Sequence, residues 1–528
     1  MIERVVENWL TSANERQYQI PFCQLLAAEG ERILYISPHG QREQGKDVIT
    51  LGPRRTVCAY QLKGGRLKLN DWRRYHGEIH ELVTYPVDHP SVTTSKHHES
   101  ILVTNGTVAD TVLSAINSAN RAWARVNAGP LRLVAGSELL DRFVKVHGRF
   151  LPRDPKDFRQ FLELVVDSGA SQFDKQKFAS FLESILPMEV SRNVAPREAQ
   201  RAIASAVLLT TYIIQGCERV ENHWAIFEAW TMIAAYIGAV ATKYKAPEKW
   251  WSTSLDLCVM AATRALDDLA RECARNQVKF TQGNPFTDGH FYGSRITILA
   301  GLLGAASLSH HLRGEEWLSE DFVRQFLLEY LPRIRLWGES AVPYLILGAL
   351  AIERRGHHAV AEGLVLQVLR TIAEVNGTKG RGIPNPYYEP EAALRITYGL
   401  DELNSEIFAG HSYTLEPLIH YLARRWIRRH LAVLWEKVTH VHFASFAVKR
   451  RWEYFRWRSD KGSLVTSTPK APQSWKELLE EAEAPPKDIP RMFKRNPELA
   501  LYFSLVYPHR LTPHLLKIIE TVLQRGRT

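Results

Sequence analysis

The sequence lacks the features of exported, disulfide-linked and zinc-binding proteins. Its first ten residues mix charge into the apolar positions, so they contain no uninterrupted apolar core of a secretory signal. The cysteines are scattered and form no CxxC pair: Cys23, Cys58, Cys217, Cys258 and Cys273. Neither a disulfide framework nor a zinc site is therefore predicted. A cytoplasmic location in a reducing compartment is expected.

Long uncharged runs are also missing. Three apolar stretches in the middle of the chain, 202–217, 229–242 and 296–309, each fall short of the roughly 18 to 20 uncharged residues that cross a bilayer. We interpret them as buried helices and do not expect a membrane partner, with a membrane-associated effector as the alternative. The chain also has no GxxxxGK[ST] sequence, which excludes a Walker A phosphate loop.

The chain has the length and composition of a folded, multidomain protein. With 528 residues, of which 45% are hydrophobic and 23% charged, it can bury at least one large core. Domains typically contain about 100 to 200 residues, so two or three units are expected.

Residues 1–152 carry alternating helix and strand patterns. The expected helices are 14–26, 71–85, 107–123 and 137–146, and the expected strands are 32–37, 47–50, 56–62, 100–104 and 131–134. Strands separated by helices of this length imply crossover connections and a partly parallel sheet covered on both faces. This order predicts an α/β domain with an αβββαβ core, closed by the prolines near residue 152.

Residues 153–528 show amphipathic helical patterns and no convincing strand alternation. We therefore expect a large all-α domain that recognises a substrate, senses a trigger or mediates oligomerisation. The segment 467–490 is rich in Pro, Lys and Glu and is predicted to be an exposed connection.

Three residues of the first domain suggest hydrolytic chemistry. Asp47 opens the second predicted strand, while Gln61 and Lys63 end the third. Adjacent antiparallel strands joined by a turn bring these positions to the same end of the sheet. Because side chains alternate along a strand, Gln61 and Lys63 share a face, and Leu62 points to the other.

This set of residues suits the hydrolysis of a phosphodiester. Such a reaction needs a divalent cation to neutralise developing charge and to lower the pKa of an attacking water. Asp47, the amide oxygen of Gln61 and the backbone carbonyl of Leu62 are hard oxygen ligands for Mg²⁺, for which Mn²⁺ can substitute. Lys63 is expected to position the water and to stabilise the charged phosphate.

The segment from Gly45 through Asp47, followed by Gln61-Leu62-Lys63, resembles the GxD…QxK core of PD-(D/E)xK nucleases, particularly the Mrr-like, restriction-endonuclease-like branch. The resemblance covers about 150 residues and implies Mg²⁺-dependent cleavage of DNA. The middle residue of the motif is often Glu in these families, so Gln61 supplies an oxygen without a charge. A bacterial role in restriction or anti-phage defence is implied as well.

The resemblance also implies a carboxylate on the first helix that faces the metal. Glu15 is the closest match and is expected to be an auxiliary catalytic acid. Glu43 is the competing carboxylate, and His39 is an auxiliary candidate for phosphate contact or proton transfer.

A basic, aromatic-rich segment lies in the second domain. Residues 424–458 hold ten Lys or Arg against two Glu, which gives a net charge of +8. Basic residues neutralise nucleic-acid phosphates, so a DNA-contacting surface is predicted. Its expected members are Arg424, Arg425, Arg428, Arg429, Lys449, Arg450 and Arg451. The interleaved aromatic residues are better explained as core positions of a helix pair.

The sequence therefore predicts a metal-dependent endonuclease with DNA as its partner. A homo-oligomer or a partner defence protein is a further expectation. The alternative from another class is a catalytically silent nucleic-acid-binding or scaffold protein, in which Gln61 marks the loss of metal binding.

Overall fold

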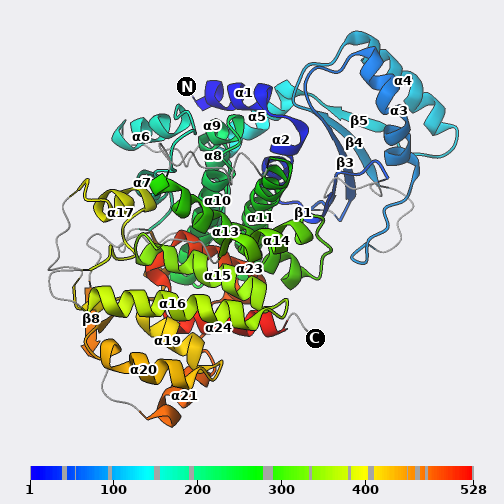
Figure 1. Cartoon of the computed structure of the whole chain (residues 1–528). Helices are drawn as coiled ribbons and strands as arrows, with labels where there is room; N and C mark the ends of the chain where they lie inside the picture. Colours follow the sequence, from blue (N-terminus) through cyan, green and yellow to red (C-terminus); the bar gives the residue numbers. More distant parts are fainter. Residues whose placement is uncertain are drawn as a thin grey trace. The chain divides into compact units, whose positions relative to one another are not determined.

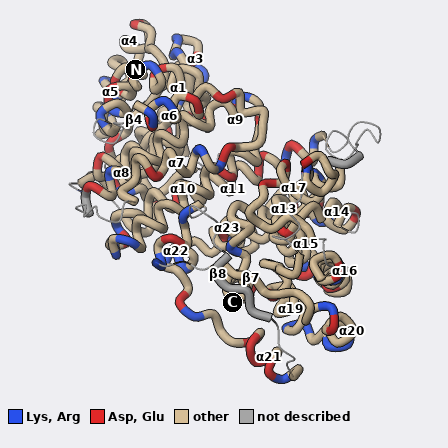
Figure 2. The backbone as a smooth tube through the Cα atoms, turned by 90° about the vertical axis from the view of Figure 1, so that its left-hand side faces the viewer, with Lys and Arg blue, Asp and Glu red and all other residues tan. Residues whose placement is uncertain are grey.

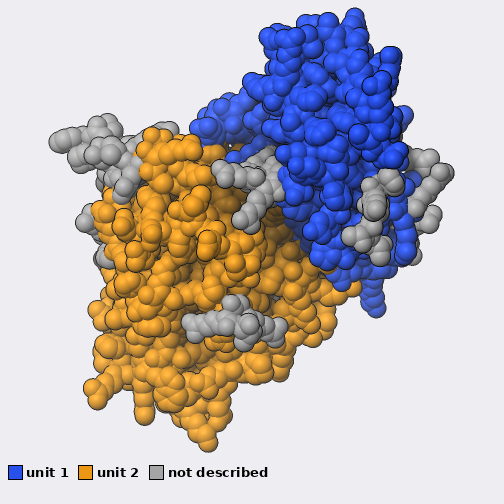
Figure 3. Space-filling view, turned by 90° about the vertical axis from the view of Figure 1, so that its right-hand side faces the viewer, with its two compact units in different colours: residues 1–221, 244–258 blue, residues 222–243, 259–528 orange. Residues whose placement is uncertain are grey.

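A computed structural model describes most of the chain. The described residues are 2–37, 44–53, 55–92, 98–147, 155–188, 196–276, 289–331, 336–377, 382–401, 409–446, 448, 450–457, 464–469 and 474–525. The chain divides into two compact units (Figure 3), residues 1–221 with 244–258 and residues 222–243 with 259–528. The domain boundary expected at residue 152 lies inside the first unit, since the helices up to residue 221 belong to it.

The first unit combines one β-sheet with helices before, between and after its strands. Its elements are α1 (Ile2–Ser12), α2 (Glu15–Glu29), β1 (Arg32–Ile36), β2 (Val48–Leu51), β3 (Val57–Lys63), α3 (Leu69–Thr84), β4 (Glu99–Thr104), α4 (Asp110–Ala124), β5 (Leu131–Val134), α5 (Gly136–His147), α6 (Pro155–Val165), α7 (Lys175–Ile185), α8 (Pro196–Ile213), α9 (Gln215–Arg219) and η1 (Glu248–Trp250). The predicted αβββαβαβα order is confirmed from α2 to α5, and α1 is an additional helix.

The sheet has five strands in the order β1-β2-β3-β4-β5. The first three strands are antiparallel neighbours, whereas β4 and β5 run parallel to β3. Helices α3 and α4 cover one face (Figure 1), and α2 packs against β1 and β3. The expected mixed sheet with crossover helices is therefore present.

Alternation along β3 decides which side chains face which helices. Ala59 belongs to the core cluster that includes Trp72 of α3, whereas Tyr60 packs edge-on against Phe22 of α2. Because alternate residues share a face, the odd-numbered positions of β3 lie toward α3. Gln61 and Lys63 therefore belong to the α3 face, as the sequence predicted.

The second unit is mostly helical. Its elements are α10 (His223–Lys243), α13 (Gly289–Arg313), α14 (Glu320–Tyr330), η3 (Glu339–Ala341), α15 (Val342–Glu353), α16 (His358–Asn376), α17 (Pro390–Thr397), β6 (His411–Ser412), α19 (Leu415–Ala423), α20 (Arg428–Val438), β7 (His442–Phe446), η4 (Arg451–Phe455), β8 (Leu464–Pro469), α21 (Trp475–Glu483), α22 (Arg491–Arg495), α23 (Glu498–Val506), η5 (Pro508–Arg510) and α24 (Pro513–Arg525). Helix α11 (Ser252–Arg275) begins in the first unit and continues into the second.

Two expectations for the helical region need correction. It contains a three-stranded sheet, β6-β7-β8, so it is not purely α-helical. The segment 467–490, predicted to be an exposed connection, includes the end of β8 and the whole of α21. Leu478 and Ala482 of α21 are buried, because α21 packs against α19.

The apolar stretches lie in helices, as expected. Among the described helices, α10 alone has the length and apolarity to span a membrane, and 89% of its apolar window is buried inside the protein. Burial of this extent is typical of a core helix. The five cysteines are likewise buried and unbridged.

Candidate functional site

Asp47 is fixed beside the end of β3 by two main-chain contacts. Its Oδ2 accepts a hydrogen bond of 2.6 Å from the amide of Leu62. Its own amide donates to the carbonyl of Tyr60 at 2.8 Å. The side chain is only 2% exposed. The structure therefore brings Asp47 to the end of the sheet that carries Gln61 and Lys63.

Lys63 lies among carboxylates. Its Nζ is 2.8 Å from Oε2 of Glu78 and 3.5 Å from Oε1 of Glu15. It also lies 4.3 Å from the centre of the Tyr75 ring. Burial by itself lowers the pKa of the Lys63 ammonium, but Glu15, Glu78 and Asp47 together raise it above its usual value. Lys63 therefore stays protonated at neutral pH.

Gln61 presents an acceptor oxygen with no partner. Its Nε2 lies 3.4 Å from Oε2 of Glu78. A carboxylate can only accept, so the amide must turn its nitrogen toward Glu78 and its oxygen away. That oxygen, Oε1, is buried and has no hydrogen-bond partner among the described residues. A buried acceptor without a donor is unfavourable, and a bound cation would satisfy it.

Helix α2 delivers Glu15 to this cluster from the other face of the sheet. Asn14 is its N-cap, and a capping box with Gln17 fixes the start of the helix. Glu15 occupies the first turn, where the helix dipole favours a negative charge. The amide of Glu15 also comes close to Gly64, at which an added Cβ would lie 3.4 Å away.

Gly45 allows α3 to approach the segment that carries Asp47. Its φ is +70°, and a Cβ at this position would lie 2.1 Å from the carbonyl oxygen of Glu78. Only glycine combines the left-handed conformation with so close an approach. The first residue of the GxD motif therefore has a structural role, because it brings Glu78 to the site.

The end of β4 holds the turn that follows Lys63. The side-chain oxygen of Asn105 accepts from the amide of Gly65 at 2.6 Å, and its nitrogen donates to the carbonyls of Leu10 and Ala13. The Thr104 hydroxyl donates to the carbonyl of Gly65 at 2.7 Å. These contacts connect the ends of β3 and β4 to the end of α1, just before Glu15.

The two carboxylates that the sequence offered as the auxiliary acid, Glu15 and Glu43, differ in what the structure describes. Glu15 lies at Lys63, whereas Glu43 and His39 are outside the described residues. Glu78 contacts both Lys63 and Gln61 and was not found from the sequence. The sequence does show that Glu78 lies on the helix directly after the QxK strand. Which side of that helix faces the site, however, depends on the packing of α3 against Gly45.

The predicted DNA-contacting arginines occupy two different environments. The side chains of Arg424 and Arg425 are only 9% and 13% exposed and form ion pairs with Glu520 and Glu353. The remaining described members are exposed: Arg428, Arg429, Arg450 and Arg451. Figure 2 marks the basic positions of α20, and Lys449 lies outside the described residues.

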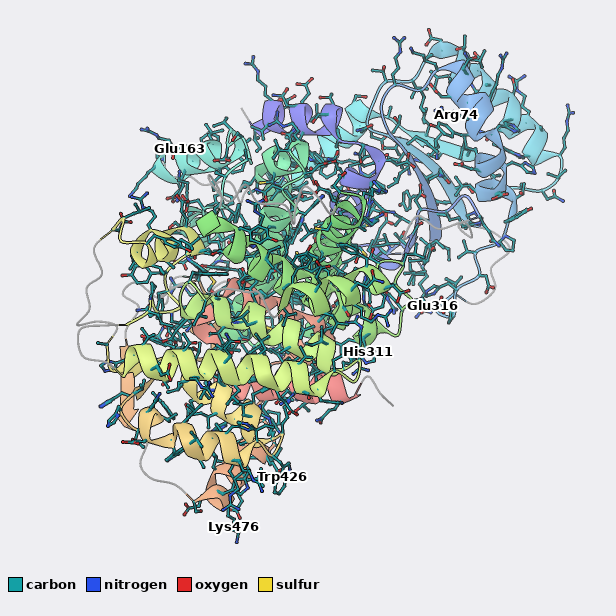
Figure 4. All side chains as sticks on the ribbon, viewed as in Figure 1. Arg74, Glu163, His311, Glu316, Trp426 and Lys476 are labelled. Carbon is teal, nitrogen blue, oxygen red and sulfur yellow. The ribbon has the colours of Figure 1, made fainter. Side chains whose placement is uncertain are left out.

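Four of the eight aromatic residues of the basic segment are buried, but they lie in β7, in η4 and directly after η4 and not on the expected helix pair. Trp452, Phe455 and Trp457 are among them. Trp426, labelled in Figure 4, is 65% exposed. Its ring centre lies 6.3 Å from that of Trp475. Stacking on bases could therefore involve Trp426 but not the buried rings.

Among the described residues, one group of carboxylate and imidazole side chains has metal-ligand spacing. Glu416 and His420 of α19 and Glu481 of α21 place one ligand atom each within 4.8 Å of one another. Arg424 lies one turn after His420 and donates to the carbonyl of Ala482 at 3.1 Å. The positive charge of this nearby guanidinium disfavours the binding of a metal cation by the three side chains.

No family model, curated protein or solved structure matches this chain. The function is therefore inferred from the geometry of the Lys63 site.

Proposed function

We propose that the first unit is a metal-dependent nuclease that hydrolyses DNA phosphodiester bonds at Asp47, Gln61 and Lys63. The single observation that carries the proposal is the buried, unpartnered Oε1 of Gln61 at the sheet end that also holds Asp47 and Lys63. A neutral amide oxygen in such a place fits a cation ligand better than a structural hydrogen bond.

The residues present fit Mg²⁺. Asp47 and Gln61 offer hard oxygen atoms, and the carbonyl of Leu62 is the third proposed ligand. The surrounding carboxylates outnumber the single ammonium of Lys63, so the site has a surplus of negative charge. When bound, the cation neutralises charge on the phosphate and activates a water molecule.

Lys63 is the residue that we assign to the scissile phosphate. Its ammonium is held by Glu78 and Glu15, so it is oriented before substrate arrives. When substrate binds, a phosphate oxygen can replace the Glu78 carboxylate as the acceptor of one hydrogen bond from Lys63. Arg74, labelled in Figure 4, lies on α3 one turn before Glu78 and is exposed, so we expect it to contact the DNA backbone.

The resemblance to PD-(D/E)xK nucleases supports the same proposal. Its αβββαβ order is the order of the elements from α2 to β4. We extend the proposal to a cytoplasmic defence or restriction enzyme, in which the helical unit recognises a substrate, senses a trigger or assembles with a partner or second copy.

The proposal is tested by incubating supercoiled plasmid with the full chain in Mg²⁺ or Mn²⁺, with EDTA as the negative control. Metal-dependent nicking is expected in the wild type and in Lys68→Ala, which removes an exposed lysine at the start of α3. The same nicking is expected to disappear in Lys63→Ala.

Two outcomes would contradict the proposal. Cleavage that survives in Lys63→Ala would place the activity elsewhere or in a contaminant. Metal-independent DNA binding without cleavage in either metal would instead favour the catalytically silent nucleic-acid-binding protein.

A further inference from the structure

A polar pocket of about 270 Å³ lies in the second unit beside the C-terminal helix α24. It is lined by residues from α15, α16, α24 and the chain just after α19, and its charged lining consists of Glu353, Arg354, Arg424, Arg425, Lys517 and Glu520. We call this the α24 pocket. Its lining contains four Lys or Arg side chains and only two carboxylates.

Both carboxylates of the α24 pocket are already engaged by arginine. Arg425 contacts Glu353 through two nitrogens, at 2.8 and 2.5 Å. It also reaches Glu520 at 2.8 Å, while Arg424 contacts the second oxygen of Glu520 at 2.5 Å. Each carboxylate in the lining is therefore already paired with at least one arginine.

One buried donor of the pocket has no acceptor in the described part of the chain. Nε of Arg424 is buried without a hydrogen-bond partner there, and the whole side chain is nine-tenths buried. Lys517 makes no ion pair with any described residue. Burial lowers the pKa of Lys517, and the neighbouring Arg424 and Arg425 lower it further, while Glu520 and Glu483 offset only part of this effect.

We propose that the α24 pocket binds a phosphate-bearing small molecule. Guanidinium and ammonium groups with free donors are the usual ligands of phosphate, and the arginines are fixed in place by Glu353 and Glu520. Arg354, whose Nη1 donates to the carbonyl of Leu523, supplies a further cation at the edge of the pocket. The phosphate belongs to a free polyphosphate or to a nucleotide.

The test measures stabilisation of the full chain by pyrophosphate and by ATP at constant ionic strength, with chloride as the matched salt. Saturable thermal stabilisation is expected, because a ligand that binds only the folded state raises its stability. Lys517→Gln is expected to weaken binding at least tenfold, and Arg354→Gln is a second variant at the same pocket. Lys517→Arg should restore binding.

Lys494→Gln is the control, since Lys494 is an exposed lysine of the same unit outside the pocket. Tighter binding of ATP than of pyrophosphate would show that the nucleoside is also recognised, and equal binding would show recognition of phosphate alone. Equal effects of Lys517→Gln and Lys494→Gln, or no saturable binding, would overturn the proposal. If a duplex oligonucleotide binds more tightly and its binding is weakened equally by Lys517→Gln, the ligand of the pocket is nucleic acid and the small-molecule proposal is wrong.

Discussion

The Lys63 site and the α24 pocket are charge clusters of opposite sign. In the first, Glu15, Asp47 and Glu78 surround one lysine. In the second, four cations share two carboxylates. Both contain a buried polar atom without a partner, and these atoms have opposite hydrogen-bonding character: Oε1 of Gln61 is an acceptor, and Nε of Arg424 is a donor.

The comparison shows why a basic or acidic residue cannot be assigned from its sequence alone. Arg424 and Arg425 belong to the most basic stretch of the chain, yet ion pairs hold them in the interior. What points to a ligand is the charge and the hydrogen-bonding capacity that remain after the internal pairs are formed. The surplus is negative at Lys63 and positive in the α24 pocket, so a cation and an anion are the respective expected ligands.

The largest expected effect separates binding from catalysis at the Lys63 site. Lys63→Ala is expected to lower the cleavage rate by about a hundredfold or more, because it removes the ammonium that stabilises the phosphate. It should not weaken Mn²⁺ binding, since it removes a positive charge from beside the metal ligands. Single-turnover cleavage and Mn²⁺ titration check the two parts. Parallel losses of both would show that Lys63 only maintains the local fold.

Gly45→Ala is expected to destabilise the protein by about 3 kcal/mol or more. The added Cβ meets the α3 backbone and strains a left-handed residue. Gly65→Ala is the matched control, because Gly65 has φ +74° but no atom within 4 Å of an added Cβ. It should cost only about 1 to 2 kcal/mol. Urea unfolding checks the difference, and equal losses would refute the role of the close α3 contact.

Arg425→Ala is expected to destabilise the protein by about 3 kcal/mol, because Glu353 and Glu520 lose a buried partner. Arg428→Ala, at an exposed position, should change stability by less than about 0.5 kcal/mol. Denaturant unfolding and DNA-binding titrations check both. If the Arg425→Ala variant is as stable as the wild type but binds DNA more weakly, Arg425 contacts DNA, as the sequence predicted, and its structural role is refuted.

A pH dependence of about 2 kcal/mol is expected from His147, which is buried between Ser205 and Tyr212 of α8. Burial lowers the pKa of His147 to about 3 in the folded protein, below its usual value of 6.5. Between these values the unfolded chain binds a proton that the folded chain does not, so stability falls as the pH falls. The contribution lost between pH 7 and pH 5 is about 2 kcal/mol.

His147→Gln removes the titrating group but keeps a hydrogen-bonding side chain. Its unfolding free energy should therefore fall less than that of the wild type between pH 7 and pH 5. Urea titrations at the two pH values measure this difference. Identical pH dependence in both proteins would show that His147 does not titrate in this range.

Much of the first unit could be predicted from local patterns. The five strands were placed within one or two residues, because β-branched and aromatic runs alternate with turns. Helix α1 was missed although Val6, Trp9 and Leu10 recur at helical spacing. The meeting of Asp47 with Gln61 and Lys63 also followed from strand register, which is a local property.

The remaining features depend on packing between distant segments. Glu78 joins the site only because α3 lies against Gly45. The sheet of β6, β7 and β8 was missed because its first strand has two residues and its partners are far away in sequence. Helix α21 did carry a local signal, the capping box of Ser474 and Glu477, which the proline-rich surroundings obscured.

The most direct test of the account is Mn²⁺ binding to the full chain, measured by calorimetry for the wild type, Asp47→Asn and Glu481→Gln. We predict that Asp47→Asn weakens binding at least tenfold and that Glu481→Gln leaves it unchanged, because the cation lies at the Lys63 site. Loss of binding in Glu481→Gln with no effect of Asp47→Asn would place the cation between α19 and α21. That result would contradict a metal-dependent active site in the first unit.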